Sequence, residues 1–312
     1  QLINAESDDE IALLKSTSEG LSVIAYGLNW QAGDNIVIAA EEFPSNRIVW
    51  ESLKPLGVTI KLVNLSASDN PEQALIDQFD ENTRLLSISS VQYTSGLRLK
   101  LETLGAACKQ RDILFCVDAI QHIGGLSFDV QAAQADFVVA DGHKWMLGPE
   151  GLALFYCRKA LVPQLSLQQY GWHMVENLDF DQMNQWQPAT TARRFECGSP
   201  NMTGSHALHA SVGLLLDIGM NEIEPRVIEN AQFLINAFSD DKNIQLLSET
   251  RRGRFGGIVT FRKNDGHNDK LYQHLVSQGV LCAPRGGGIR FSPHFHTTKD
   301  QLKTAVEYVK SF

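Results

Sequence analysis

The stretch DFVVADGHKWMLGPEG, residues 136–151, carries a lysine directly behind a histidine, just after an apolar run. That lysine is Lys144, and an earlier apolar run of the chain ends in Asp118. Ligands of open α/β sheets bind at the carboxyl ends of the strands, so we expect the Asp118 carboxylate and the Lys144 amine to share one crevice. A lysine in a partly buried site, directly behind a histidine, can have a lowered pKa and form an imine with an aldehyde. The alternative is a structural ion pair, which also occurs at the ends of sheets.

A second stretch, KSTSEGLS at residues 15–22, has the spacing of a helix N-terminus that could bind an anion. Ser16 precedes Glu19 by three residues, which is the capping-box pattern, and this gathers Thr17, Ser18 and free backbone N–H groups at the helix start. Such a start favours a phosphate, although most capping boxes only cap helices. A phosphate site, a carboxylate and a lysine together would hold a phosphorylated pyridine aldehyde.

Short apolar runs alternate with amphipathic stretches through the first half of the chain, which predicts the strands and crossover helices of a mostly parallel sheet. The strands are expected at residues 35–40, 59–63, 84–91, 113–119, 137–140 and 152–157. Helices are expected between them, at about residues 19–29, 46–54, 71–77, 101–110 and 129–134. The fold class is therefore α/β.

The second half of the chain predicts a smaller domain. Residues 160–200 are rich in Gln, Asn and aromatic residues and predict a long ordered excursion. Helices are expected at 203–219 and 223–239, strands in RFGGIVTFR and GGGIRFSPH, and a closing helix in TKDQLKTAVEYVKSF. We therefore expect a large domain at residues 1–225 and a small C-terminal α/β domain at residues 226–312.

Composition and charge argue against several classes of function. The 312 residues include 27 basic and 36 acidic ones, with a net charge of −9 and no Lys/Arg-rich run, so nucleic acid is not expected as a partner. No apolar run reaches membrane-spanning length and the first residues lack the pattern of a signal peptide, so we expect a cytoplasmic protein without a membrane partner. Five widely spaced cysteines without a C-x-x-C pattern predict reduced thiols and no metal site.

The motifs STSEG, EEFPSNRIVW, VDAIQHIGGLSFDV, ADGHKWMLGPEG, RFECGSPN and GGGIRFSPH resemble, in order and spacing, those of the class V aminotransferase group of pyridoxal 5′-phosphate (PLP) enzymes. That group includes cysteine desulfurases, isopenicillin N epimerase-like proteins and related lyases. The resemblance covers essentially the whole chain and implies the PLP-dependent transferase fold of type I. It also implies that an N-terminal segment of the family is not in this chain.

The resemblance makes Lys144 the residue that forms an imine with PLP and then moves the substrate α-proton. Asp118 resembles the acid that keeps the pyridine nitrogen protonated, and Gln121 resembles the residue that hydrogen-bonds the ring hydroxyl. Phe43 stands where the family stacks a ring over the cofactor. Without the resemblance, a core phenylalanine would be the expectation at this position.

The resemblance also implies a phosphate site, because Thr17, Ser18 and His143 look like phosphate ligands. Many family members have serine or another small residue where Asp141 stands, so we expect this carboxylate to turn away from the phosphate or to bind His143. Ser199 resembles a threonine that reaches the phosphate of the neighbouring subunit. This implies a homodimer with shared active sites.

Three further residues concern the substrate. Arg290 resembles the arginine that binds the substrate α-carboxylate, a role that the planar guanidinium suits. Gln92 and Tyr93 are expected to line the substrate pocket. Cys282 is the candidate nucleophile of a desulfurase, but only a short segment separates it from Arg290, so we expect a buried small hydrophobic residue instead.

The resemblance therefore predicts a PLP-dependent enzyme that acts on a small α-amino acid as an aminotransferase or a lyase. Cysteine desulfurase, selenocysteine lyase-like and epimerase activities are alternatives, because all of these reactions begin with the same adduct of substrate and cofactor. A PLP-binding scaffold with weak catalysis is the alternative outside enzymes. The set of Asp118, Gln121 and Lys144 argues against it, because a scaffold has no need of an electron sink.

Overall fold

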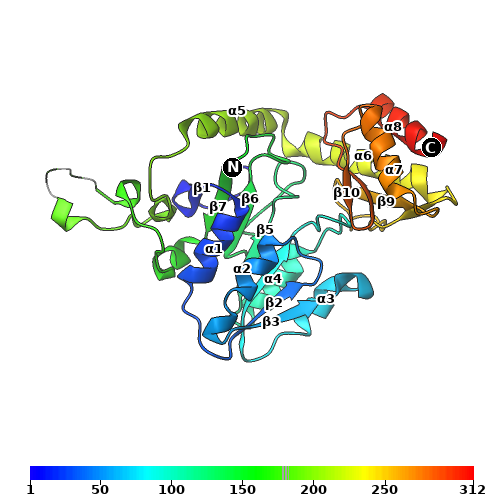
Figure 1. Ribbon diagram of the computed structural model, residues 1–312. Coiled ribbons are helices and arrows are strands. Elements are labelled where there is room, and N and C mark those ends of the chain that lie inside the picture. Colours follow the sequence, from blue (N-terminus) through cyan, green and yellow to red (C-terminus); the bar gives the residue numbers. More distant parts are fainter. Residues whose placement is uncertain (178, 180, 182) are drawn as a thin grey trace. The chain divides into compact units, whose positions relative to one another are not determined.

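The computed structural model describes residues 1–177, 179, 181 and 183–312. The chain divides into two compact units (Figure 1). The large unit comprises residues 1–90, 100–124 and 128–214, and the small unit comprises residues 91–99, 125–127 and 215–312. The domain boundary predicted after residue 225 falls within helix α6 (Met220–Ser239), whereas the two units divide within helix α5 (Met202–Ile218).

A seven-stranded sheet forms the centre of the large unit (Figure 1), in the order β1-β7-β6-β5-β4-β2-β3. Five neighbouring strands, β3, β2, β4, β5 and β6, run parallel to one another. Strand β7 pairs antiparallel with β6, and β1 pairs antiparallel with β7. The predicted α/β fold with a mostly parallel sheet is confirmed. The strand bounds are β1 Ile11–Leu14, β2 Asn35–Ala39, β3 Thr59–Val63, β4 Thr83–Ser89, β5 Leu114–Asp118, β6 Phe137–Asp141 and β7 Ala153–Cys157.

Helices cover this sheet and pack closely against its strands. Strand β2 is buried along its whole length, as expected for a parallel strand covered on both faces. The helices of this half are α1 Thr17–Gly27, α2 Ser45–Glu51, α3 Pro71–Ile76 and α4 Leu101–Lys109. At Gly20 of α1, a Cβ atom would lie 2.7 Å from the Cγ1 atom of Val139 in β6, so glycine lets α1 approach the sheet closely.

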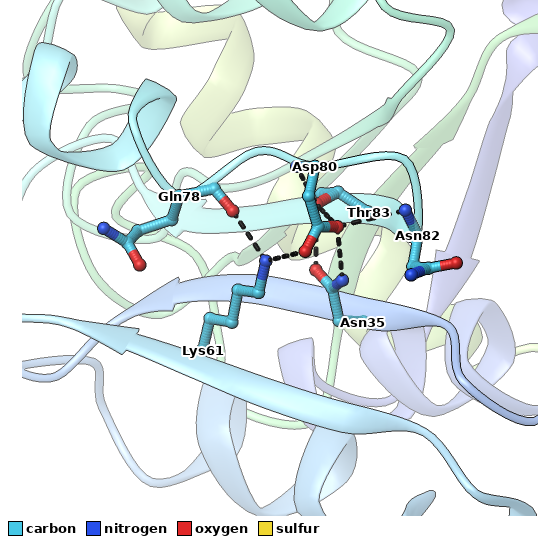
Figure 2. A network of polar contacts seen from close by, with 6 residues as sticks. All are labelled: Asn35, Lys61, Gln78, Asp80, Asn82 and Thr83. Carbon is cyan, nitrogen blue, oxygen red and sulfur yellow. Dashed lines mark hydrogen bonds and ion pairs between the residues drawn. The ribbon is translucent and has the colours of Figure 1, made fainter.

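A polar network fixes the opposite edge of the sheet, where β2 and β4 begin (Figure 2). The carboxylate of Asp80 accepts hydrogen bonds from Asn35 Nδ2 at 2.8 Å and from Asn82 N at 3.0 Å, and it pairs with the ammonium group of Lys61. The bond from Lys61 is the main cause that holds the pKa of Asp80 well below its usual value. Thr83 joins the network by donating to Asn35 Oδ1 at 2.9 Å. The starts of the two strands are thereby held in register.

The small unit packs three helices against one face of a four-stranded antiparallel sheet, in the order β10-β11-β9-β8. Phe261 of β9 and Phe291 of β11 face the helices and join Phe238 of α6 in one core cluster. Side chains alternate along strands, so Arg290 and Thr260 point to the other face. The bounds are β8 Ile244–Leu246, β9 Val259–Lys263, β10 Ala283–Arg285, β11 Gly288–Phe291, α6 Met220–Ser239, α7 Asn268–Ser277 and α8 Lys299–Ser311.

Several predicted elements need correction. The helix expected at residues 129–134 is a turn instead, because Asp129 Oδ1 accepts from the backbone N–H groups of Gln131 and Ala132. Helix α7 and the short strands β1, β8 and β10 were not expected. The excursion at 160–200 contains short 3-10 helices, and the structure has such helices at Asp8–Glu10, Lys54–Leu56, Leu65–Ala67, Lys159–Gln164, Trp172–Met174, Met183–Gln185 and Ala192–Phe195.

Candidate active site

The carboxyl ends of β5 and β6 carry the acid and the lysine that the sequence singled out. The two strands pair in parallel, with Asp118 opposite Val139, so Asp118 and Asp141 end neighbouring strands, and Lys144 follows three residues later. Asp118 is 2% exposed, and Ile120 N donates to its Oδ1 atom at 3.1 Å. Burial raises the pKa of Asp118 to about 7, against the bond from Ile120. A buried acid of this kind binds a cationic nitrogen well.

Lys144 lies against an aromatic ring. Its Nζ atom is 5.7 Å from the ring centroid of Phe43, which stands in the loop between β2 and α2. The Phe43 side chain is 39% exposed, so it is not the core residue that its type alone would suggest. The loop between β2 and α2 and the segment after β6 thus place the Lys144 amine beside the exposed ring of Phe43.

Gln121 has a partner that the sequence analysis missed. Trp145 Nε1 donates to Gln121 Oε1 at 2.9 Å, and both side chains are buried. The turn after β5 lies against the backbone at Trp145. Gly124 in this turn has a φ of +95°, and a Cβ there would lie 2.3 Å from the Trp145 oxygen. Only glycine adopts this conformation and leaves this space without strain.

The N-terminus of α1 forms the expected cap in a modified way. Ser16 Oγ accepts from Glu19 N at 3.2 Å, but Glu19 Oε2 accepts from Lys15 N at 2.6 Å, one residue before the usual partner. The hydroxyl of Ser18 donates to Ser45 Oγ at 2.8 Å, so the starts of α1 and α2 meet. Ser45 is therefore a further candidate that the sequence analysis missed, although it lies two residues after Phe43.

Asp141 connects β6 with this helix start. Thr17 N donates to Asp141 Oδ1 at 2.7 Å, and Asp141 N donates to Thr17 Oγ1 at 3.1 Å. The Oδ2 atom of Asp141 lies 3.9 Å from His143 Nδ1, within ion-pair distance. The structure thus brings together three of the expected phosphate ligands, Thr17, Ser18 and His143, at the end of β6 beside Lys144.

A buried polar network behind Phe43 was also missed. Glu42 Oε1 accepts from Ser89 N at 2.8 Å, while Glu42 Oε2 accepts from Asn46 Nδ2 at 2.9 Å and from the Ser89 hydroxyl. Asn46 Oδ1 in turn accepts from Trp50 Nε1 at 2.9 Å and from Ser87 Oγ at 2.7 Å. All five side chains are buried. The available signal was the pair of serines in the otherwise apolar β4 run, together with Asn46 and Trp50 one helical turn apart.

The expected substrate residues lie in the small unit. Arg290 of β11 donates from Nη1 to the backbone oxygen of Tyr93 at 2.8 Å. Its Nε atom is buried and has no hydrogen-bond partner among the described residues. Burial, followed by the charge of Arg285, lowers the pKa of Arg290. Gln92 is buried, and its N–H donates to Leu97 O at 2.9 Å in the turn that precedes Arg98.

Ser199 and Cys282 stand elsewhere in the chain. Ser199 lines a pocket of about 220 Å³ with Lys15 and Glu19, and its role toward a neighbouring subunit stays a prediction. Cys282 is half-buried rather than buried, and burial raises the pKa of its thiol. Among the described residues no three His, Cys, Asp or Glu side chains could hold a metal ion, and no described helix is long and apolar enough to cross a membrane.

Comparison with known proteins gives a consistent result. The probable cysteine desulfurase of Methanothermobacter thermautotrophicus is 29% identical over 98% of this chain and 79% of its own. The cysteine desulfurase of Yersinia pestis is 30% identical over 89% of this chain and 68% of its own. The cystine C–S lyase C-DES, solved with its product cysteine persulfide, shares the fold with a TM-score of 0.90 at 20% identity, over 98% of this chain and 82% of its own. The model of the aminotransferase class V family matches residues 1–303, and the chain belongs to this family, as its motifs indicated.

Proposed function

We propose that this chain is a PLP-dependent lyase that breaks the C–S bond of a small sulfur-containing amino acid, cysteine or cystine. The observation that carries the proposal is the placement of Lys144 and the buried Asp118 at neighbouring strand ends, with the exposed ring of Phe43 beside the lysine. The named activities of the relatives, cysteine desulfurase and cystine C–S lyase, support the choice of a sulfur substrate.

The residues of the large unit fit PLP. Asp118 is an acid in a buried setting, suited to a pyridinium nitrogen. Gln121 has its oxygen engaged by Trp145, which leaves its NH2 group to donate to the ring hydroxyl. The backbone N–H of Ser18, in the first turn of α1, and the ring of His143 supply donors for a phosphate at this helix start.

When bound, PLP withdraws electrons from the substrate α-carbon through its protonated ring. Asp118 holds the proton on the ring nitrogen. Lys144 Nζ would hold the cofactor by its aldehyde and would accept the proton from the substrate α-carbon. The bonding electrons of the Cβ–S bond would leave with the sulfur, which is released as sulfide from cysteine or as cysteine persulfide from cystine. The α-carboxylate is assigned to Arg290, because its buried Nε has no partner among the described residues and a guanidinium edge matches a carboxylate.

Elimination is favoured over desulfuration through a protein thiol. A desulfurase transfers the substrate sulfur to a cysteine and releases alanine, whereas elimination releases pyruvate and ammonia. Cys108, Cys116 and Cys157 are buried, and burial raises the pKa of each thiol. Cys282 directly precedes β10 and its pKa is also raised, so its thiolate is disfavoured as a nucleophile.

The first experiment is the visible spectrum of the purified protein with PLP, followed by product analysis with L-cysteine, L-cystine and L-alanine. We expect pyruvate and ammonia from the sulfur amino acids. Lys144→Ala is expected to lose the visible band of the attached cofactor and to lower turnover by about a thousandfold or more, as for removal of an essential proton-transfer group. Lys109→Ala, at the exposed end of α4, is the control. Turnover retained in Lys144→Ala would refute the proposal, and release of alanine with persulfide would identify a desulfurase instead.

We also propose that the chain works as a cytoplasmic homodimer in which Ser199 reaches the neighbouring subunit's cofactor phosphate. The resemblance of CGSPN to the family motif supports this. Sedimentation of the PLP-loaded protein tests the oligomeric state, and a monomer at all concentrations would contradict it.

A further inference from the structure

Asp141 places a negative charge at the point where the proposed function requires the cofactor phosphate. Its Oδ1 atom accepts from Thr17 N, the first N–H group of α1, at 2.7 Å. Its own backbone N–H donates to the hydroxyl oxygen of Thr17 at 3.1 Å. The side chain is 16% exposed and is locked onto the helix by this reciprocal pair of bonds.

The other donors of the first turn of α1 show what Asp141 leaves for a ligand. The first four N–H groups of a helix have no partner in the helix itself. Glu19 N donates to Ser16 Oγ at 3.2 Å, and Gly20 N makes the first bond within the helix, to Ser16 O at 3.1 Å. With Thr17 N donating to Asp141, the Ser18 N–H is a donor of this first turn that neither the cap nor Asp141 engages. A phosphate at this helix end is thus left with Ser18 and His143, and it has an ionisable acid as its neighbour.

The groups around Asp141 come from three elements. His143, at 3.9 Å from Oδ2, and Lys144 follow it on the same segment, Asp118 faces it from β5, and the uncharged Thr17 faces it from α1. Burial raises the pKa of Asp141, while Thr17, His143 and Lys144 act in the opposite direction. A doubly charged phosphate at this helix end would add negative charge beside the carboxylate of Asp141.

Resting on the proposed function, we propose that Asp141 is a built-in anion of the phosphate site, so that a phosphorylated ligand binds with uptake of a proton and its affinity falls as pH rises. The physical basis is that a nearby like charge disfavours the charged form of a group. The second pKa of a phosphate ester lies near 6, so the proton that permits binding is easily supplied at neutral pH and is scarce at higher pH. The proton is shared between the phosphate and Asp141.

The test uses 4′-deoxypyridoxine 5′-phosphate, which has the ring and the phosphate but no aldehyde, so that Lys144 cannot attach to it. Calorimetry in two buffers of different ionisation enthalpy measures both the Kd and the protons taken up, between about pH 6.5 and 8.5. We expect the wild-type protein to take up about one proton and its Kd to rise about tenfold per pH unit above neutrality. Asp141→Asn keeps an oxygen for Thr17 N, and we expect its Kd to be lower at high pH and its proton uptake to be smaller by about one.

Controls separate the phosphate from the ring and from the fold. Unphosphorylated 4′-deoxypyridoxine is expected to bind the wild type and Asp141→Asn alike. Asp129→Asn removes a comparable acid from the turn at Gln131 and is expected to change nothing. Asp141→Ser serves as a second variant if Asp141→Asn does not fold, with the same expectation.

Three results would overturn the inference while leaving the proposed function intact. They are equal pH dependence in wild type and Asp141→Asn, a loss of phosphate-dependent binding in Asp141→Asn, and an equal change for both ligands. If PLP gives no visible band of lysine-attached cofactor and the wild type binds no phosphorylated ligand, both the proposed function and this inference are wrong.

Discussion

Replacing Glu42 by glutamine tests whether the buried network behind Phe43 depends on a carboxylate. Glu42 accepts hydrogen bonds from Ser89 N, the Ser89 hydroxyl and Asn46 Nδ2. Asn46 cannot rotate its amide, because its oxygen already accepts from Trp50 and Ser87. In Glu42→Gln an NH2 group therefore faces the NH2 group of Asn46 wherever the new oxygen accepts from Ser89 N.

The cost follows from these contacts. Leaving a buried donor unpaired costs about 1–3 kcal/mol, and the lost hydrogen bond adds about 1 kcal/mol. We therefore expect the free energy of unfolding to fall by about 2–4 kcal/mol. Asn46→Asp alone places two carboxylates together in a buried site and is expected to be destabilising to a similar extent.

The double variant Glu42→Gln with Asn46→Asp restores a donor opposite an acceptor. Urea unfolding of the four proteins, followed by far-UV circular dichroism and tryptophan fluorescence, gives the coupling energy of the pair. We expect the double variant to be more stable than the sum of the single changes predicts by about 2 kcal/mol. Additivity within about 0.5 kcal/mol would refute the reasoning, because it would mean that the two side chains do not act on each other.

Two further predictions concern the ends of the sheet. Asp80→Asn removes the charged partner of Lys61, whose bond holds the pKa of Asp80 below its unfolded value. A carboxyl group with a lowered folded pKa stabilises the protein above its unfolded pKa and loses this effect as pH falls through the folded pKa. We therefore expect the wild type to be more stable than the variant at neutral pH, with a difference that shrinks on acidification, measured by urea unfolding at several pH values. An equal difference at all pH values would contradict this. Gly124→Ala should lower the free energy of unfolding by about 2 kcal/mol or more, because the alanine would have a positive φ and its Cβ would clash with the Trp145 oxygen. Gly33 has a similar φ but open space around it, so Gly33→Ala should cost less in thermal unfolding. Equal costs would show that the contact with the Trp145 oxygen is unimportant.

The sequence was most informative where buried parallel strands are long. The apolar runs at β2, β4, β5 and β6 stand out because both faces of these strands are covered, and parallel neighbours bring their carboxyl ends together. Asp118 and Lys144 could therefore be expected at one edge before the structure was known. Strands β1, β8 and β10 are three or four residues long, too short for an alternating pattern to be distinguished from chance.

The missed parts of the site depend on contacts between distant residues. Glu42 and Ser89 are 47 positions apart, and nothing in the EEFPSN stretch shows that its second glutamate is buried. At residues 129–134 a local contact made the helix prediction wrong. The Asp129 side chain accepts from the backbone N–H groups of Gln131 and Ala132, and a turn forms in place of the expected helix. Asp141 was recognised as unusual, and its contact with Thr17 became clear only from the position of α1 on the sheet.

The hydrogen bond from Trp145 fixes the orientation of the Gln121 amide, whose oxygen and NH2 group are similar in size. The indole offers only a donor, so the amide oxygen must turn toward it, and the opposite end of Gln121 presents only N–H groups. A molecule that meets this end must bring an oxygen or another acceptor, while a donor is repelled. Trp145, the residue after Lys144, thus selects which chemical groups can meet Gln121, although it need not touch the ligand itself. Phenylalanine at position 145 would fill similar space and leave the amide able to turn either way.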